Sequence, residues 1–81
     1  MLEVQVSGSL RTAVSGAASI KVEAATIREL MNYLIAHYPA MQSRIDEGVA
    51  VSINGNIFRD NWSETIPEDA EVFLMPRLAG G

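Results

Sequence analysis

One apolar strand that runs into an Asn-Gly turn constrains the fold more than any other feature of the chain. Residues 49–53 alternate valine or isoleucine with small side chains, the period-two pattern of a strand that buries one face. Asn54-Gly55 comes directly after it, and both central residues of a type I′ turn need positive φ, which these residue types tolerate. The sequence therefore predicts a two-residue β-hairpin that pairs Ser52 with Ile57, leaves Ile57 on the outer face and sends Phe58 to the core.

Three further segments are predicted to be strands. Residues 2–6 and 20–22 alternate apolar and polar side chains, and we expect them to pair as a hairpin. Residues 72–75 are apolar at every position, which suits a strand with apolar side chains on both faces of a sheet. The alternation sends Phe73 and Met75 outward. A weak helical turn is expected between the first two strands, and a turn before the last one.

The main helix is predicted to begin at Thr26-Ile27-Arg28-Glu29, which matches a capping box. Apolar side chains then recur at spacings of three and four, from Ile27 to Tyr38, and form one stripe that would pack on a sheet. Pro39 should end this helix, because the residue before a proline avoids the α conformation. A short second helical piece through Arg44 is expected to be separate.

Composition excludes several classes of protein. The 81 residues contain no cysteine, so neither a disulfide framework nor a thiolate metal site is available. The net charge of −4 and the single lysine argue against nucleic-acid binding, and they suit a partner with a basic docking face. No apolar run is long enough to span a membrane, and we expect a cytoplasmic protein without a signal peptide. The lone His37 is read as a surface residue, and Met31, Met41 and Met75 as packing residues.

The order of these elements, β-β-α-β-β-β, predicts an α+β roll. We expect a mixed sheet of four to five strands with one main helix packed across it, and a first strand that neighbours the last. Trp62 should close one end of the core. Residues 1–76 would form the domain and residues 77–81 a flexible tail.

The chain ends in a segment with unusual chemistry, Leu78-Ala79-Gly80-Gly81. Pro76 removes a ladder donor, so regular pairing should stop near it, and these last four residues have no charged side chain and no helix cap. Two glycines without side chains could thread a narrow channel and present a free carboxylate. The alternative reading is a frayed end without a function.

Beside this tail the outer face of the sheet would carry three large apolar side chains, Ile57, Phe73 and Met75. Around them we expect small or polar residues, namely Glu3, Gln5, Ser7, Ala50 and Ser52. Such a group is a candidate docking patch. The alternative is that these are ordinary exposed apolar side chains.

The order of elements resembles the ubiquitin-like β-grasp fold and, more closely, the MoaD/ThiS family of sulfur carriers. The resemblance covers nearly the whole chain. Its motifs are Thr26 to Leu30, Tyr38-Pro39, Val51-Ser52-Ile53-Asn54-Gly55, Pro67 to Val72, and the ending from Pro76 to Gly81.

The resemblance implies a carrier rather than an enzyme, with no bound cofactor. A ubiquitin-activating-type enzyme would use ATP to adenylate the Gly81 carboxylate, and a sulfur donor would then replace AMP to leave a thiocarboxylate. In molybdopterin carriers of this family the terminal sulfur is delivered to the large subunit of molybdopterin synthase during molybdenum cofactor biosynthesis. Leu78, Ala79 and Gly80 would occupy the partner's channel.

By the same resemblance Ile57, Phe73, Met75 and Arg77 would dock the partner. Arg77 stands where molybdopterin carriers commonly have a second proline, and Ala79 where serine or threonine is frequent, whereas Pro76 favours the molybdopterin branch. A carrier for thiamine or another sulfur-containing metabolite therefore stays open. So do a protein modifier conjugated through Gly81 and a plain interaction domain. An independent enzyme is disfavoured, since no nucleophile–base pair can be assembled.

Overall fold

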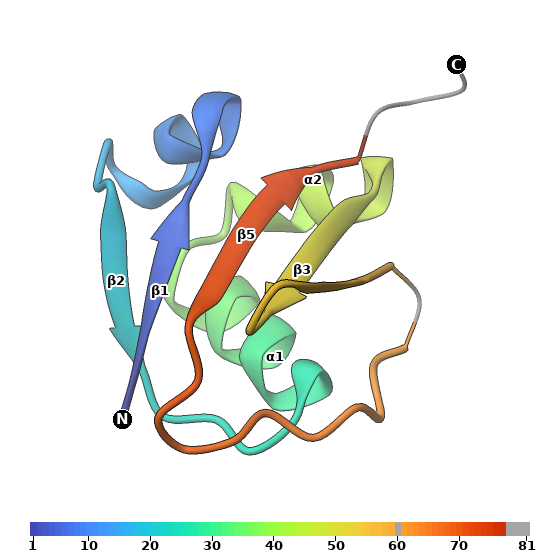
Figure 1. Cartoon of the computed structure of the whole chain (residues 1–81). Coiled ribbons are helices and arrows are strands. Elements are labelled where there is room, and N and C mark those ends of the chain that lie inside the picture. The colour runs from blue at the N-terminus through green and yellow to red at the C-terminus, as the bar shows by residue number, and fades with distance from the viewer. Residues whose placement is uncertain (60, 78–81) are drawn as a thin grey trace.

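The structure, a computed structural model, describes residues 1–59 and 61–77. Within these residues, five strands form one mixed sheet in the order β2-β1-β5-β3-β4, with helices on one face (Figure 1). The elements in chain order are β1 (Leu2–Val6), the 3₁₀ helix η1 (Gly8–Val14), β2 (Ser19–Val22), α1 (Ile27–His37), α2 (Met41–Glu47), β3 (Val49–Ile53), β4 (Asn56–Phe58) and β5 (Val72–Pro76). The predicted α+β fold is confirmed.

The last strand lies at the centre of the sheet. β5 runs parallel to β1 on one side and antiparallel to β3 on the other, while the β1–β2 and β3–β4 hairpins complete the two edges. The prediction that the first and last strands are neighbours is therefore confirmed. Because β5 is paired on both sides, its direction is fixed by two ladders, and the chain leaves the sheet from its middle rather than from an edge.

The Asn-Gly hairpin has the predicted register, with Ser52 opposite Ile57. Asn54 has φ of 51° and Gly55 has φ of 88°, as a type I′ turn requires. Asn54 has a second task that the turn motif does not indicate. Its backbone N–H donates to the carbonyl of Glu71 at 2.9 Å, and its Oδ1 accepts from the Glu71 N–H at 2.9 Å. The turn is thus bonded to the residue that precedes β5.

The start of α1 is capped as predicted, with one difference in detail. The Glu29 N–H donates to Thr26 Oγ1 at 3.2 Å, but Glu29 Oε1 accepts from the N–H of Ala25, one residue before the N-cap, at 2.8 Å. Two further N-terminal N–H groups of the helix, those of Ile27 and Arg28, donate to the carbonyls of Glu64 and Trp62. The loop before β5 is therefore attached to the helix by backbone bonds.

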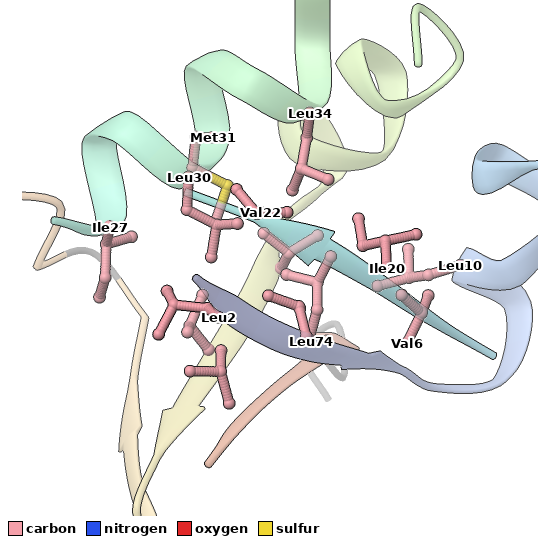
Figure 2. Packing of buried hydrophobic residues seen from close by; sticks show 14 of the residues in the cluster. Leu2, Val6, Leu10, Ile20, Val22, Ile27, Leu30, Met31, Leu34 and Leu74 are labelled. Carbon is pink, nitrogen blue, oxygen red and sulfur yellow. The ribbon is translucent and has the colours of Figure 1, made fainter. Parts of the chain in front are cut away.

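The core lies between the sheet and the helices (Figure 2). The predicted stripe of α1 is buried at Ile27, Leu30, Met31 and Leu34, and Tyr38 is half-buried. Met41 is also fully buried, which confirms a packing role for it. Trp62 is half-buried against the core, as predicted. The inward side chains of the strands complete the core: Leu2, Val4, Val6, Ile20, Val22, Val49, Val51, Ile53, Val72 and Leu74.

The outer face of the sheet differs from the prediction at two positions. Ala50 and Ser52 point outward but are only 4% and 7% exposed. Ala50 lies opposite Met75, and Ser52 lies between Phe73 on β5 and Ile57 on β4. The neighbouring strands β4 and β5 carry larger side chains on this face, and these cover the small side chains of β3. The expectation that Ala50 and Ser52 surround the apolar group as exposed residues is therefore wrong.

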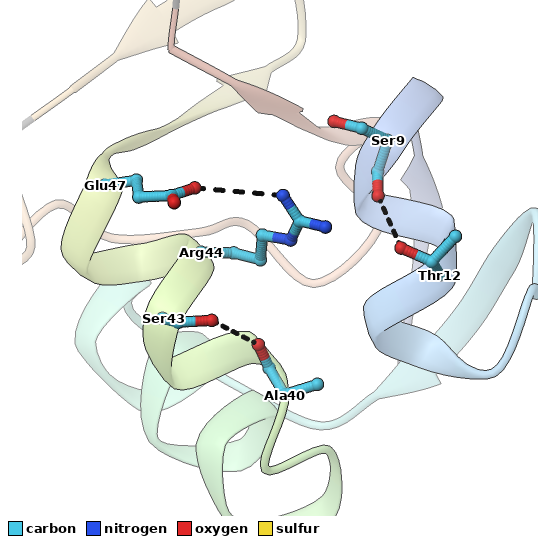
Figure 3. A network of polar contacts seen from close by, with 6 residues as sticks. All are labelled: Ser9, Thr12, Ala40, Ser43, Arg44 and Glu47. Carbon is cyan, nitrogen blue, oxygen red and sulfur yellow. Dashed lines mark hydrogen bonds and ion pairs between the residues drawn. The ribbon is translucent and has the colours of Figure 1, made fainter.

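The helix after Pro39, α2, is longer than predicted and packs beside η1. Figure 3 shows the polar contacts there. Arg44 Nη1 lies 3.8 Å from Glu47 Oε1, and the hydroxyls of Ser43 and Thr12 each donate to a carbonyl three residues earlier in the chain. Among the described residues no helix has the length and apolar character needed to cross a membrane.

Candidate interaction surface and chain exit

The described chain leaves the sheet at Arg77, immediately after β5. Pro76 lies opposite Val49 in the ladder, and the Arg77 N–H still donates to the carbonyl of Gly48 at 3.1 Å. Backbone pairing thus continues one residue beyond the proline. This bond between Arg77 and Gly48 fixes where the described chain ends beside the sheet.

Gly48 makes this exit possible. It has φ of 117° and ψ of 126°, a conformation that residues with a Cβ rarely adopt. A Cβ atom at position 48 would lie 3.2 Å from Cδ and 3.4 Å from Cβ of Arg77. Sequence reasoning missed this residue. A glycine between a helix and a strand does indicate positive φ, but no local signal shows that Arg77 packs against it.

Four residues predicted to form the docking patch are brought together on the outer face around the end of β5. Ile57 is 57% exposed, Phe73 is 38% exposed, Met75 is half-buried and Arg77 is exposed. We call Ile57, Phe73 and Met75 the apolar patch. A hollow of about 430 Å³ adjoins it, lined by Ala50, Ile57, Arg59, Met75, Pro76 and Arg77.

The remaining predicted site residues, Leu78, Ala79, Gly80 and Gly81, lie outside the described residues. What the structure establishes is the start of this segment at Arg77, beside the apolar patch. The adjacency of patch and exit results from the central position of β5, because Phe73 and Met75 belong to the same strand that ends at the exit.

A second hollow lies on the helix side of the same exit. It measures about 460 Å³ and is lined by Arg28, Ile45, Asp46, Glu47, Gly48, Val49, Arg59, Trp62 and Arg77. Sequence reasoning did not find it, because its three arginines are separated by 31 and 18 positions in the chain and no motif connects them.

Side chains with catalytic or metal-binding chemistry are sparse in the part of the chain that the structure describes. Within residues 1–59 and 61–77 no group of three or more histidine or acidic side chains could hold a metal ion. The exposed His37 stacks on Tyr33, with ring centroids 4.1 Å apart, on the exposed side of α1.

A main helix packed across a mixed sheet, with parallel first and last strands at its centre, defines a ubiquitin-like β-grasp domain. The chain belongs to the ThiS family, whose model matches residues 4–81. The match includes the terminal Gly80-Gly81. A search of curated proteins found no match.

Solved structures agree on the fold. The chain is 21% identical to small archaeal modifier protein 1 from Methanosarcina acetivorans, with 98% and 94% of the two chains covered and a TM-score of 0.76. It is 20% identical to a chain of the BexX/CysO complex of Amycolatopsis orientalis, with 98% of each covered and a TM-score of 0.77. It is 19% identical to subunit 1 of a proposed molybdopterin converting factor from Pyrococcus furiosus, with 94% and 95% covered and a TM-score of 0.77.

The family match and the fold of these solved structures therefore agree.

Proposed function

We propose that this protein is a sulfur carrier whose Gly81 carboxylate is adenylated and then converted to a thiocarboxylate. The observation that carries the proposal is the family match, which runs through the final residue and so includes the Gly-Gly end. The apolar patch beside the exit supports it, because an enzyme acting on Gly81 needs a surface to hold.

The chemistry begins with a carboxylate, which is a poor electrophile. A carboxylate oxygen of Gly81 attacks the α-phosphorus of ATP, and pyrophosphate leaves. Hydrosulfide then attacks the acyl carbon. The bond to AMP breaks, and the C-terminus carries sulfur in place of one oxygen. The activating enzyme supplies the nucleotide site, and the carrier supplies the substrate carboxylate and the surface that positions it.

The accepting pathway that we propose is molybdopterin synthesis, with this chain as the small, non-catalytic subunit of molybdopterin synthase. Its support is the shared fold with the Pyrococcus furiosus protein and the presence of Pro76. Arg77 and Ala79 depart from the pattern of molybdopterin carriers, so a carrier for thiamine or another sulfur-containing metabolite is the alternative within the same chemistry. The apolar patch together with Arg77 would then contact the large subunit or another accepting enzyme.

Conjugation to proteins through Gly81 is a second candidate function. The specific observation in its favour is the similarity in fold to small archaeal modifier protein 1 from two organisms. In that case a lysine amine, rather than a sulfur donor, attacks the activated carboxyl group and forms an isopeptide bond.

The test uses the full chain with its cognate adenylating enzyme, MgATP and sodium sulfide, followed by intact mass measurement. We expect a mass increase equal to one exchange of oxygen for sulfur, dependent on ATP. A variant without Gly81 is the control and should remain unmodified. Adenylation without any sulfur incorporation, together with isopeptide-linked adducts in cell extracts, would replace the carrier assignment with the modifier.

The pathway is tested separately. The purified thiocarboxylated protein is supplied to the large subunit of molybdopterin synthase with its pterin substrate, and dithiolene formation is measured. Transfer only to a thiazole-forming enzyme would reassign the pathway and leave the carrier chemistry intact.

A further inference from the structure

Half of the cationic side chains of this acidic protein gather at one place. Of its six lysines and arginines, Arg28, Arg59 and Arg77 line the hollow of about 460 Å³ between the end of α2, the end of β4 and the start of α1. We call this the arginine hollow. Arg59 and Arg77 also line the hollow on the outer face, so the arginine hollow continues into the surroundings of the apolar patch.

The sign of the charge here is opposite to that of the molecule. The lining holds three arginines and two carboxylates, for a formal charge of +1, whereas the other three cations and eight carboxylates of the chain give −5. Both carboxylates of the lining have partners within α2. Asp46 Oδ1 accepts from Gln42 Nε2 at 3.0 Å, and Glu47 Oε1 lies 3.8 Å from Arg44 Nη1. The lining of the hollow thus has a positive formal charge in a chain that is otherwise acidic, and this favours a negatively charged partner group there.

One wall of the hollow holds an arginine against an aromatic ring. The guanidinium carbon of Arg28 lies 5.9 Å from the centre of the Trp62 ring, and the Arg28 N–H donates to the Trp62 carbonyl at 2.8 Å. Because a guanidinium is planar and pre-organised, arginine loses less side-chain entropy for each hydrogen bond that it forms with a carboxylate. Tryptophan and arginine are also the residue types enriched where protein interfaces bind most strongly.

The arginine hollow lies beside Arg77, and this position determines which partner can contact it. Gly81, the reacting residue of the proposed function, is four positions beyond Arg77, and at roughly 3.5 Å per residue this segment spans at most about 14 Å. An enzyme that acts on the Gly81 carboxylate must therefore approach Arg77 closely. A specific interface covers about 800 Å² of each partner. A contact area of that size around Arg77 includes the adjoining rim of the arginine hollow.

We propose that the arginine hollow binds a carboxylate-bearing segment of the adenylating enzyme that activates the carrier. This inference rests on the proposed function and adds the chemistry of the partner's surface to it. The apolar patch and the arginine hollow then form one contact area on the two sides of the exit. The charge pairs raise the rate of encounter and hold the tail in register, and both effects weaken as salt is added.

The test compares the wild-type chain, Arg28→Gln, Arg59→Gln and the double variant in ATP–pyrophosphate exchange with the adenylating enzyme. We expect the double variant to raise KM for the carrier about tenfold at low salt, with little change in kcat. Added salt should raise the wild-type KM and leave that of the double variant nearly unchanged. Lys21→Gln, on the exposed side of β2 at the far edge of the sheet, is the matched control and should behave as wild type.

Three other outcomes would contradict this assignment of the arginine hollow. Equal KM values for the wild-type chain and the double variant, with unchanged circular dichroism, would overturn the assignment of the arginine hollow alone. Binding of ATP or pyrophosphate to the free carrier that is lost in the double variant would assign the hollow to phosphate instead of protein carboxylates. If the wild-type chain supports no exchange at all, the proposed function itself fails, and this inference fails with it.

Discussion

At the scale of single residues, Gly48 controls the geometry of the chain exit, and Gly48→Ala should destabilise the protein. A backbone forced into this region costs about 1–3 kcal/mol, and the new methyl group also meets Arg77 Cδ at 3.2 Å. Urea denaturation should show a lower free energy of unfolding. Gly16→Ala is the control, because Gly16 also has positive φ but nothing lies within 4 Å of its Cβ position.

The contact with Arg77 can be separated from the backbone strain by a double-mutant cycle. If the methyl group and Arg77 collide, Arg77→Ala should recover part of the loss caused by Gly48→Ala. Equal losses for Gly48→Ala and Gly16→Ala, with no recovery, would mean that Arg77 moves aside without cost.

Residue types predicted local conformation better than they predicted partners. Asn54 was correctly assigned to a tight turn, because positive φ is a property of the residue itself. Its bonds to Glu71 could not be predicted, since they join positions 17 apart that meet only after β5 has inserted beside β3. Gly48 was missed for the same reason.

At the scale of elements, the N-cap of α1 should contribute measurably to the free energy of unfolding. Thr26→Ala removes the acceptor of the Glu29 N–H, and we expect a loss of about 1 kcal/mol in the free energy of unfolding. Thr12→Ala removes a hydroxyl that donates to the Ser9 carbonyl, and should cost clearly less. A loss at Thr26 no larger than at Thr12 would show that the loop bonds from Glu64 and Trp62 hold the helix start without the cap.

The strands, the main helix and their order were predictable, because apolar periodicity, the capping box and the Asn-Gly turn are local signals that agree with one another. The exposure of individual outer-face residues was not. Ala50 and Ser52 fit the predicted alternation, yet they are buried because larger side chains stand opposite them on β4 and β5. The arginine hollow needs three segments to meet. The apolar patch was predictable because its members lie on two strands. The Asn-Gly turn and the period-two alternation together indicate which side chains of these strands point to the outer face.

At the scale of the whole molecule, alternate side chains of β5 serve two roles, core packing and docking of a partner. Substitutions at the neighbouring positions 74 and 73 should separate these roles. Leu74 is fully buried between the sheet and the helices, so Leu74→Ala should cost about 2–5 kcal/mol, a large part of the stability of a domain of this size. Phe73 lies on the opposite face and is 38% exposed, so Phe73→Ala should lower the free energy of unfolding much less. Phe73→Ala should instead weaken docking, and raise KM for the carrier in ATP–pyrophosphate exchange while the protein stays folded.

Thermal unfolding and exchange kinetics on the same two variants measure both tasks. Leu74→Ala should lower the midpoint of unfolding strongly, and below that midpoint its KM should remain near the wild-type value. The apolar patch has a docking role only if Leu74→Ala lowers mainly the stability and Phe73→Ala raises mainly the KM. A purely structural Phe73 would lower stability on substitution and leave KM unchanged. If Phe73→Ala changes neither quantity, the apolar patch is an ordinary exposed surface and the partner must hold the carrier elsewhere around the exit.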